Sequence, residues 1–225
     1  MLDFDWSSLV VAAPVILAGA VVTLKVTLSA IVGGLVGGTA LALLGVCGVR
    51  PLEAFSRIYV TLFRSVPLGM VLLWFFLIVP QALRAVLGEA MAIDIRLASA
   101  IVGFCLLESA FFAEIIRAGI LGLPKGQKQA ALSLGMTPMQ AMAHVVLPQA
   151  FRNMLPIILT QCIVIFQDTS LVYVISLEDF FRNSVSVGER DGTLIPMLLF
   201  AGFCYWLICS SLAGVVKTLQ SRSAA

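Results

Sequence analysis

Three long uncharged runs constrain the fold of this chain more than any other feature. They cover residues 26–49, the nineteen residues between Arg64 and Arg84, and residues 192–216. A helix that crosses a bilayer needs about 20 apolar residues. A soluble domain has about a quarter charged residues, whereas here only 12% are charged and 60% are hydrophobic. A soluble bundle would therefore have too little polar surface to cover it, and the runs predict membrane-spanning helices.

Two further segments have the same apolar character but contain acidic residues. Residues 97–116 include Glu108 and Glu114, and residues 153–177 include Asp168. The chain contains no internal repeat, low-complexity tract or linker. We therefore expect residues 1–225 to form one all-α integral membrane domain, a bundle of five spans.

The basic residues predict the orientation of this bundle. With the N-terminus outside, nine of the fourteen basic residues fall on the cytoplasmic side, four fall outside, and Lys25 lies in the first span. This asymmetry agrees with the positive-inside rule and predicts a cytoplasmic C-terminus. The cytoplasmic group is Arg50, Arg57, Arg64, Arg117, Lys125, Lys128, Arg152, Lys217 and Arg222. The acidic residues predicted to fall on the outer side are Asp3, Asp5, Glu89, Asp94, Glu178, Asp179, Glu189 and Asp191.

A polar interruption, QAALSLGMTPMQAMAHVVLP at residues 129–148, then falls on the cytoplasmic side. Gly135 indicates a turn, Pro138 can begin a second short helix, and Pro148 is expected to stop what precedes it. Small side chains at Ala130, Ala131 and Gly135 would let another protein approach the backbone.

This segment resembles the coupling loop of bacterial ABC-importer permeases. The positions that carry the resemblance are Gln129, Ala130, Ala131, Gly135, Leu147 and Pro148. Gln129 stands where glutamate is usual, and Val145 where isoleucine is usual. The resemblance implies that residues 118–148 form a cytoplasmic coupling segment that docks into a cleft of an ATPase subunit.

Other stretches resemble the polar amino-acid uptake branch of these permeases. They are AEIIRAGILGLPKGQ (113–127), FRSVPL (63–68) and QDTSLVYVIS (167–176), with Phe111 where tyrosine is usual. FDWSS and DFFRNSVSVGERDGT are similar to the glutamate/aspartate subgroup. The resemblance implies a permease of the bacterial inner membrane that works with two ATPase subunits, a periplasmic binding protein and a second, paralogous permease in a heterodimer.

The chain itself has no signature of catalysis. It contains no GxxxxGK[ST] phosphate loop and no nucleophile–base arrangement, so ATP and Mg²⁺ are expected on the partner ATPase and no catalytic residue is assigned. His144 is the only histidine and has no cysteine at ligand spacing, so no metal site is expected. The net charge of +2 gives no reason to expect nucleic acid as a partner.

Candidates for the substrate path come from polar groups at membrane depth. Gln167, Asp168, Thr169 and Ser170 could break the fourth span and begin a new helix, whose N-terminus would suit a carboxylate. Glu108 and Arg64 are further candidates, because ionisable groups at this depth are costly. The alternatives are internal ion pairs and hydroxyl groups that bond within their own helix.

The substrate class also keeps alternatives at this point. The chain could be a permease for glutamine, arginine or histidine. A secondary transporter and a membrane scaffold are further alternatives, but both are less consistent with the coupling-like segment.

Overall fold

The computed structural model describes residues 6–87 and 95–223, and all regular structure within them is helical. This confirms the all-α prediction. Of the residues used for orientation, Asp3, Asp5, Glu89 and Asp94 lie outside the described part. The elements, in chain order, are α1 (Trp6–Leu44), α2 (Arg50–Ser65), α3 (Leu68–Leu87), α4 (Ile95–Leu121), α5 (Lys125–Ser133), α6 (Pro138–Ala141), the π-helical turn η1 (Met142–Val146), α7 (Leu147–Asp168), the 3₁₀ helix η2 (Thr169–Ile175), α8 (Phe180–Arg190) and α9 (Leu194–Ser223).

Four helical stretches of the described residues are long and apolar enough to cross a membrane. A fifth span results if α2 and α3, which meet at a bend of 100°, are counted as one broken span. The four are Val11–Leu44, Ile95–Leu121, Pro138–Ile175 and Leu194–Thr218. Four to five candidate spans agree with the prediction of five.

The first two spans differ from their predicted boundaries. The uncharged run that indicated the first span starts at residue 26, but α1 already begins at Trp6; Lys25, predicted to lie inside the span, is exposed on the helix surface and does not interrupt it. The helix α2 was not predicted at all, since its residues were read as a charged cytoplasmic flank. It begins with Pro51 in its first turn and is followed by Val66 and Pro67, a pair that disfavours helix continuation.

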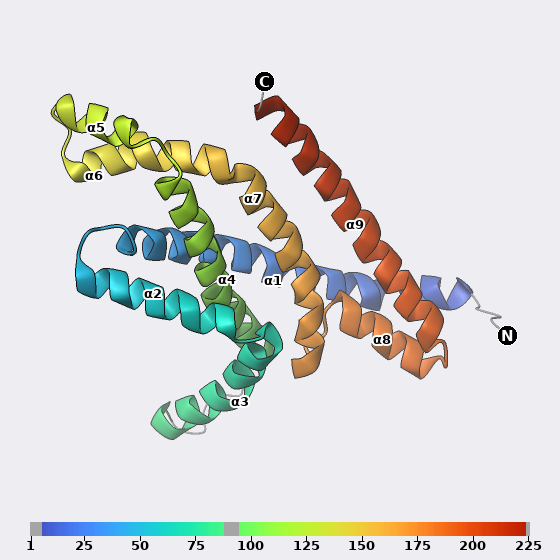
Figure 1. The fold of residues 1–225 in the computed structure, drawn as a ribbon. Coiled ribbons are helices and arrows are strands. Elements are labelled where there is room, and N and C mark those ends of the chain that lie inside the picture. Colours follow the sequence, from blue (N-terminus) through green and yellow to red (C-terminus); the bar gives the residue numbers. More distant parts are fainter. Residues whose placement is uncertain (1–5, 88–94, 224–225) are drawn as a thin grey trace.

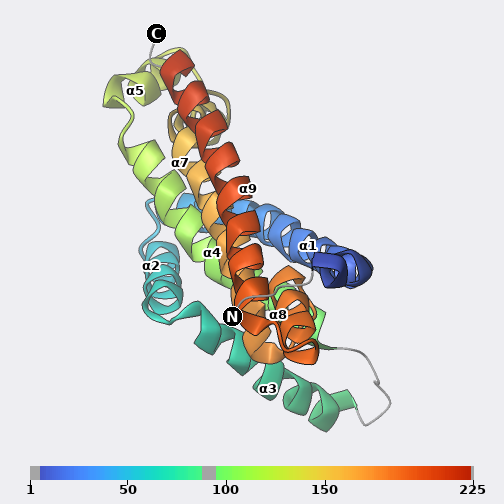
Figure 2. The same ribbon diagram turned by 90° about the vertical axis from the view of Figure 1, so that its right-hand side faces the viewer.

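The core is centred on the contact between α1 and α4, which cross near the middle of the molecule (Figures 1 and 2). Gly34 and Gly38 of α1 lie directly against α4. A Cβ atom on Gly34 would lie 2.8 Å from Glu108 Cβ, and one on Gly38 would lie 2.9 Å from the backbone nitrogen of Ala113. The two glycines therefore permit an approach that no larger residue allows, as in other small-residue contacts of membrane helices.

The helix α8 is fastened to α1 by polar contacts in the segment between the last two spans. Asp179 is fully buried and caps α8 by accepting a hydrogen bond from the Arg182 backbone N–H at 2.8 Å. The Phe180 N–H donates to Thr23 Oγ1 at 3.1 Å, and Asn183 Nδ2 donates to the Val15 carbonyl at 2.8 Å. Burial raises the pKa of the Asp179 carboxyl to about 6, although the hydrogen bonds it accepts oppose the rise.

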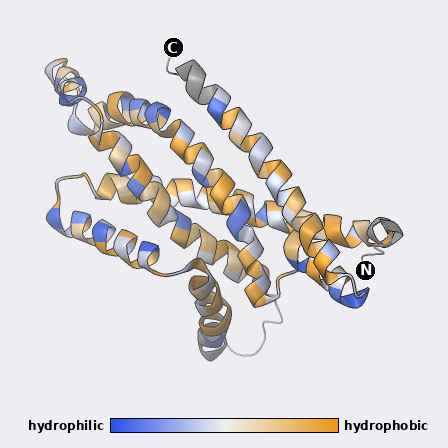
Figure 3. Cartoon of the chain, turned by 45° about the vertical axis from the view of Figure 1, so that its right-hand side comes forward, coloured by the Kyte–Doolittle hydropathy of each residue, from blue (hydrophilic) through white to orange (hydrophobic). Residues whose placement is uncertain are grey.

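The apolar and polar surfaces are distributed unevenly (Figure 3). Hydrophilic residues gather on α5 and along one side of α2, while α9 is mostly hydrophobic on its outer surface. On α9, Leu199, Phe203 and Trp206 are all more than half exposed. An exposed apolar surface of this kind is expected where a helix faces lipid or another membrane helix.

Candidate functional site

The predicted turn at Gly135 is present and has a complete set of backbone hydrogen bonds. After α5 ends, the Met136 N–H donates to the Ala131 carbonyl at 3.2 Å and the Gly135 N–H donates to the Leu132 carbonyl at 3.0 Å. Gly135 has φ of +84°, a conformation that favours glycine. These three features together form a Schellman motif, so the sequence itself specifies where α5 stops.

The next helix has an equally specific beginning. Thr137 Oγ1 accepts a hydrogen bond from the Gln140 N–H at 3.3 Å, and Gln140 Oε1 accepts one from the Thr137 N–H at 2.9 Å. This is a capping box, and Pro138 stands at the first helical position, as predicted. The two helices and the turn form a hairpin at one end of the molecule (Figure 1).

The hairpin presents apolar side chains on an otherwise polar surface. Leu134 is 83% exposed and Met139 is 77% exposed, one on each side of the turn. Of the residues predicted to couple, Gln129, Ala130 and Gly135 are exposed as well, whereas Ala131 is buried. This arrangement can contact a partner protein without any change in the core.

Leu147 and Pro148 lie away from the turn, and the prediction that Pro148 ends a helix is wrong. Helical backbone runs without a gap from Pro138 to Ile175. Pro148 is in the first turn of α7, and the turn before it, η1, is π-helical. A wider turn accommodates a proline ring that would clash with a carbonyl in a regular α-helix.

The predicted break at residues 167–170 also differs from the structure. The backbone narrows from α-helix to the 3₁₀ helix η2 but does not restart, so no free helix N-terminus forms. Thr169 Oγ1 donates to the Phe166 carbonyl at 2.7 Å, and Ser170 Oγ donates to the Gln167 carbonyl at 2.9 Å. The hydroxyl groups bond within their own helix, and Thr169 is fully buried. Gln167 is exposed, and Asp168 is partly exposed.

Glu108 lies in the core of the bundle, against the glycines of α1. Its side chain is almost fully buried, and its Oε2 accepts a hydrogen bond from Gln161 Nε2 of α7 at 2.9 Å. Its Oε1 has no hydrogen-bond partner among the described residues. Glu108 therefore forms no ion pair in this part of the chain and links α4 to α7 through an amide.

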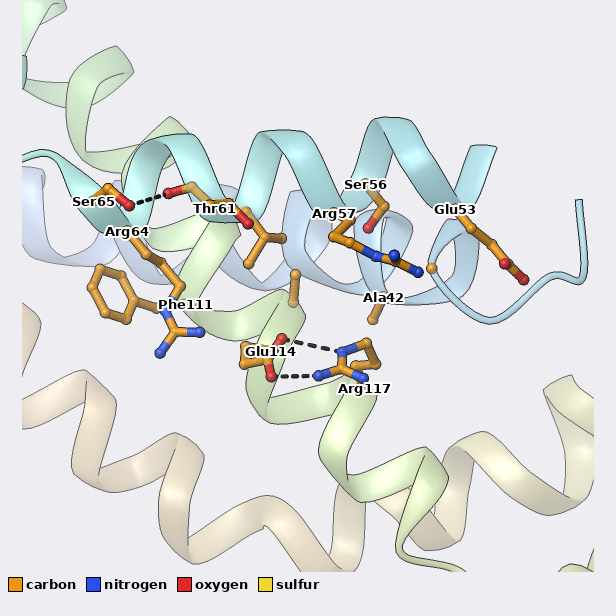
Figure 4. A pocket seen from close by; sticks show the side chains of 13 residues that line it. Ala42, Glu53, Ser56, Arg57, Thr61, Arg64, Ser65, Phe111, Glu114 and Arg117 are labelled. Atoms are coloured by element: carbon orange, nitrogen blue, oxygen red, sulfur yellow. Dashed lines mark hydrogen bonds and ion pairs between the residues drawn. The ribbon is translucent and has the colours of Figure 1, made fainter. Parts of the chain in front are cut away.

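A cavity of about 680 Å³ lies between the end of α1, the helix α2 and the second half of α4 (Figure 4). Arg64, predicted as a substrate-path residue, lines it, and its guanidinium carbon lies 5.5 Å from the centre of the Phe111 ring. On the α4 wall, Arg117 forms a bidentate ion pair with Glu114. The cavity does not include Glu108 or residues 167–170, so the predicted substrate-path residues are not gathered in one place.

Residues that the sequence reading did not single out complete the cavity. Arg57 and Ser56 of α2 line it together with Arg117. A signal was present, because Glu53, Arg57 and Arg64 follow at spacings of four and seven and hence lie on one helix face. Among residues 6–87 and 95–223, no group of three or more His, Cys, Asp or Glu side chains could hold a metal ion.

Comparison with known proteins identifies the family. Residues 34–224 match the family described as "Binding-protein-dependent transport system inner membrane component". The chain is 54% identical over 224 residues to the glutamate/aspartate import permease protein GltK of Escherichia coli, with 100% of each chain covered. It is 31% identical to the arginine transport system permease protein ArtQ of Bacillus subtilis, with 98% of each covered.

Solved structures agree with this assignment. An amino acid ABC transporter chain matches with a TM-score of 0.84 and 28% identity, covering 98% of this chain and 100% of that one. The MetNI methionine ABC transporter matches in fold alone, with a TM-score of 0.68 and 18% identity, covering 96% of this chain and 99% of that one. The chain therefore belongs to the family of binding-protein-dependent transport system inner membrane components, and within it to the permease subunits of amino-acid ABC importers.

Proposed function

We propose that this chain is the membrane subunit of an importer that carries glutamate and aspartate across the bacterial inner membrane. The observation that carries the proposal is the 54% identity to a glutamate/aspartate permease over the whole length of both chains. Relatives named for arginine, cystine or glutamine are 28–32% identical. Permease subunits of this family are not enzymes, and they depend on a separate ATPase and a substrate-binding protein.

In the proposed assembly, two ATPase subunits bind ATP and Mg²⁺ on the cytoplasmic side. A second permease, a paralogue of this chain, completes the wall of the translocation path. A periplasmic binding protein delivers the amino acid to the outer face. The hairpin of α5 and α6 supports this view, because it offers exposed Leu134 and Met139 at the end of the molecule that carries the C-terminus (Figure 1).

The coupling residues have separate tasks in this proposal. Gln129, Ala130 and Gly135 meet the ATPase cleft, and Ala131 packs beneath them. Leu147 and Pro148 belong to the base, where the wider turn η1 joins the hairpin to α7. Gln149 supports this junction by donating from Nε2 to Gln127 Oε1 at 3.3 Å.

We assign the substrate path to two levels of the bundle. Arg64 lines the cavity near the hairpin, and Gln167, Asp168 and Ser170 lie at the far end of α7 with at least part of each side chain exposed. Thr169 and Glu108 are buried between helices, so we assign them to holding the path in shape. Alternating access would then move substrate from the level of Gln167 to the level of Arg64.

Uptake into proteoliposomes tests the substrate. The complete complex is reconstituted with its binding protein, and uptake of labelled L-glutamate is measured with ATP inside. A tenfold excess of unlabelled L-aspartate should abolish the signal, and the same excess of L-arginine, L-histidine or L-glutamine should not. Competition by one of these three instead of aspartate would assign the importer to that amino acid.

Accessibility of single cysteines tests the orientation. In a variant without the five native cysteines, Glu189→Cys on α8 should react with an impermeant thiol reagent added from the periplasmic side. Lys128→Cys on α5 should react only after the membrane is permeabilised. Both positions are exposed, so labelling of both from one side would contradict the proposed topology.

A further inference from the structure

The cavity beneath α2 carries more positive charge than its own residues neutralise. Three arginines line it, Arg57 and Arg64 from α2 and Arg117 from α4. Arg117 is paired with Glu114. Glu53, the other acidic residue of the lining, accepts a hydrogen bond at Oε1 from the Gly48 N–H at 2.9 Å and keeps its negative charge beside the cavity.

The lining therefore has a formal charge of +1, and Arg57 and Arg64 are its two arginines outside a salt bridge. Neither forms a salt bridge with a carboxylate anywhere in the described ranges 6–87 and 95–223. Arg64 is instead held against the Phe111 ring, a contact that orients a guanidinium and leaves its N–H groups available. In Figure 4, Arg64 reaches from α2 toward Phe111 of α4, and Arg57 extends along α2 in the direction of Glu53.

The two guanidinium groups are held on the same wall by the packing of α2. Residues seven apart lie on one face of a helix and about 10 Å apart along it. Ser56 Oγ donates to the Leu41 carbonyl of α1 at 2.7 Å, and Tyr59 O–H donates to the Leu106 carbonyl of α4 at 2.9 Å. These bonds fix the rotation of α2, so Arg57 and Arg64 face the cavity together.

The place of the cavity in the fold connects it to the coupling hairpin. Its lining reaches Gly45, next to the end of α1, and Arg117, one turn before the end of α4. Three residues separate the end of α4 from the start of α5. The cavity thus lies in the half of the molecule nearest the hairpin, and α4 forms its wall.

We infer that Arg57 and Arg64 form an anion-binding site for the two carboxylates of an acidic amino acid on the inward-facing half of the translocation path. Guanidinium groups bind carboxylates through paired, charge-assisted hydrogen bonds, and the cavity volume of about 680 Å³ is in the range of small-molecule sites. The inference rests on the proposed function, since it takes glutamate or aspartate as the substrate.

The test is glutamate uptake by the reconstituted complex with single substitutions in this chain. Arg57→Gln and Arg64→Gln should each lower uptake at limiting glutamate about tenfold, because each removes a charge-assisted contact. Arg57→Lys and Arg64→Lys keep the charge and should retain most of the uptake. Arg50→Gln is the matched control, an exposed arginine of the same helix outside the cavity, and should transport like the wild type.

Three outcomes would overturn the inference. In the first, the glutamine variants transport like the wild type. In the second, lysine and glutamine variants lose uptake equally, which would mean that shape and not charge is required. In the third, the deficit of the glutamine variants vanishes in vesicles of phosphatidylcholine alone and appears only with phosphatidylglycerol, which would assign the two arginines to lipid headgroups. If the wild-type complex imports no acidic amino acid, the proposed function itself fails, and that result is read before any variant is compared.

Discussion

The α1–α4 contact and the turn of the α5–α6 hairpin both depend on glycine, for opposite reasons. At Gly34 and Gly38 the backbone is ordinary helix and the space beside it is filled by α4. At Gly135 no atom lies within 4 Å of where a Cβ would be, but φ is +84°. The α1–α4 contact needs glycine because a side chain would clash with α4. The turn at Gly135 needs glycine because its backbone has a positive φ. The first contact holds the bundle together, and the second shapes the exposed end of the α5–α6 hairpin.

The largest effect is expected from filling the α1–α4 contact. A side chain on Gly38 would meet Phe112 Cβ at 2.6 Å and the Ala113 backbone nitrogen at 2.9 Å, and backbone cannot give way. Gly38→Leu should therefore prevent stable folding, since overpacking alone costs about 1–3 kcal/mol and here the helices must separate. Yield and thermal unfolding of the purified protein measure this. Gly202→Leu on α9, where nothing lies within 4 Å, is the control.

A second substitution should separate folding from coupling. Gly135→Asp places a charged side chain in a left-handed turn on the exposed hairpin, at a strain of about 1–2 kcal/mol. We expect normal insertion and yield but no ATP-driven uptake, because the docking surface is altered. Gly126→Asp, on the same hairpin with open space around it and no positive φ, shows whether a charge alone has this effect. Normal uptake by Gly135→Asp with the ATPase bound would refute the coupling role.

Asp179, the buried cap of α8, should have a smaller, pH-dependent effect on the stability of the protein. The folded-state pKa of Asp179 is raised from 3.8 to about 6, so the folded protein binds more protons than the unfolded one between these values. Its contribution to stability is therefore greatest below pH 4 and falls as pH rises to 6, by about 3 kcal/mol at most. Asp179→Asn keeps a capping residue and should remove this slope from thermal unfolding curves measured in detergent. An unchanged slope in the variant would assign the pH dependence to another group.

The smallest effect is expected at Thr169. Thr169→Val removes one hydrogen bond to the Phe166 carbonyl and should lower stability by about 0.5–1.5 kcal/mol. Because the side chain is buried, the KM for glutamate should stay within about twofold of the wild type. A rise in KM without a loss of stability would place Thr169 in direct contact with substrate.

The turn of the hairpin could be predicted because its chemistry is local. Gly135, Thr137 and Pro138 act on neighbouring backbone groups, and their residue types alone specify a stop and a start. The apolar spans were predictable for a similar reason, since a bilayer selects uncharged runs. Lys25 lies inside α1, as predicted for the first span, because a single lysine on an exposed helix face does not interrupt the helix.

Features that depend on packing could not be predicted in this way. The charges of α2 were assigned to a cytoplasmic flank, although they lie on one face of a helix above a cavity. Thr169 and Ser170 are residue types that often cap helices. Here their hydroxyl groups donate instead to the Phe166 and Gln167 carbonyls of the same helical segment. Pro148 did not end its helix because the widened turn η1 accommodates it.

The Schellman turn and the capping box have a consequence for recognition of the hairpin. Every hydrogen bond that defines the turn between Ala131 and Gln140 is made within the chain itself. A partner that docks there meets a rigid shape and does not have to order a flexible loop, so association avoids the conformational entropy that such ordering would cost. Because the hairpin is rigid, a movement of a docked partner would be transmitted directly to α4 and α7.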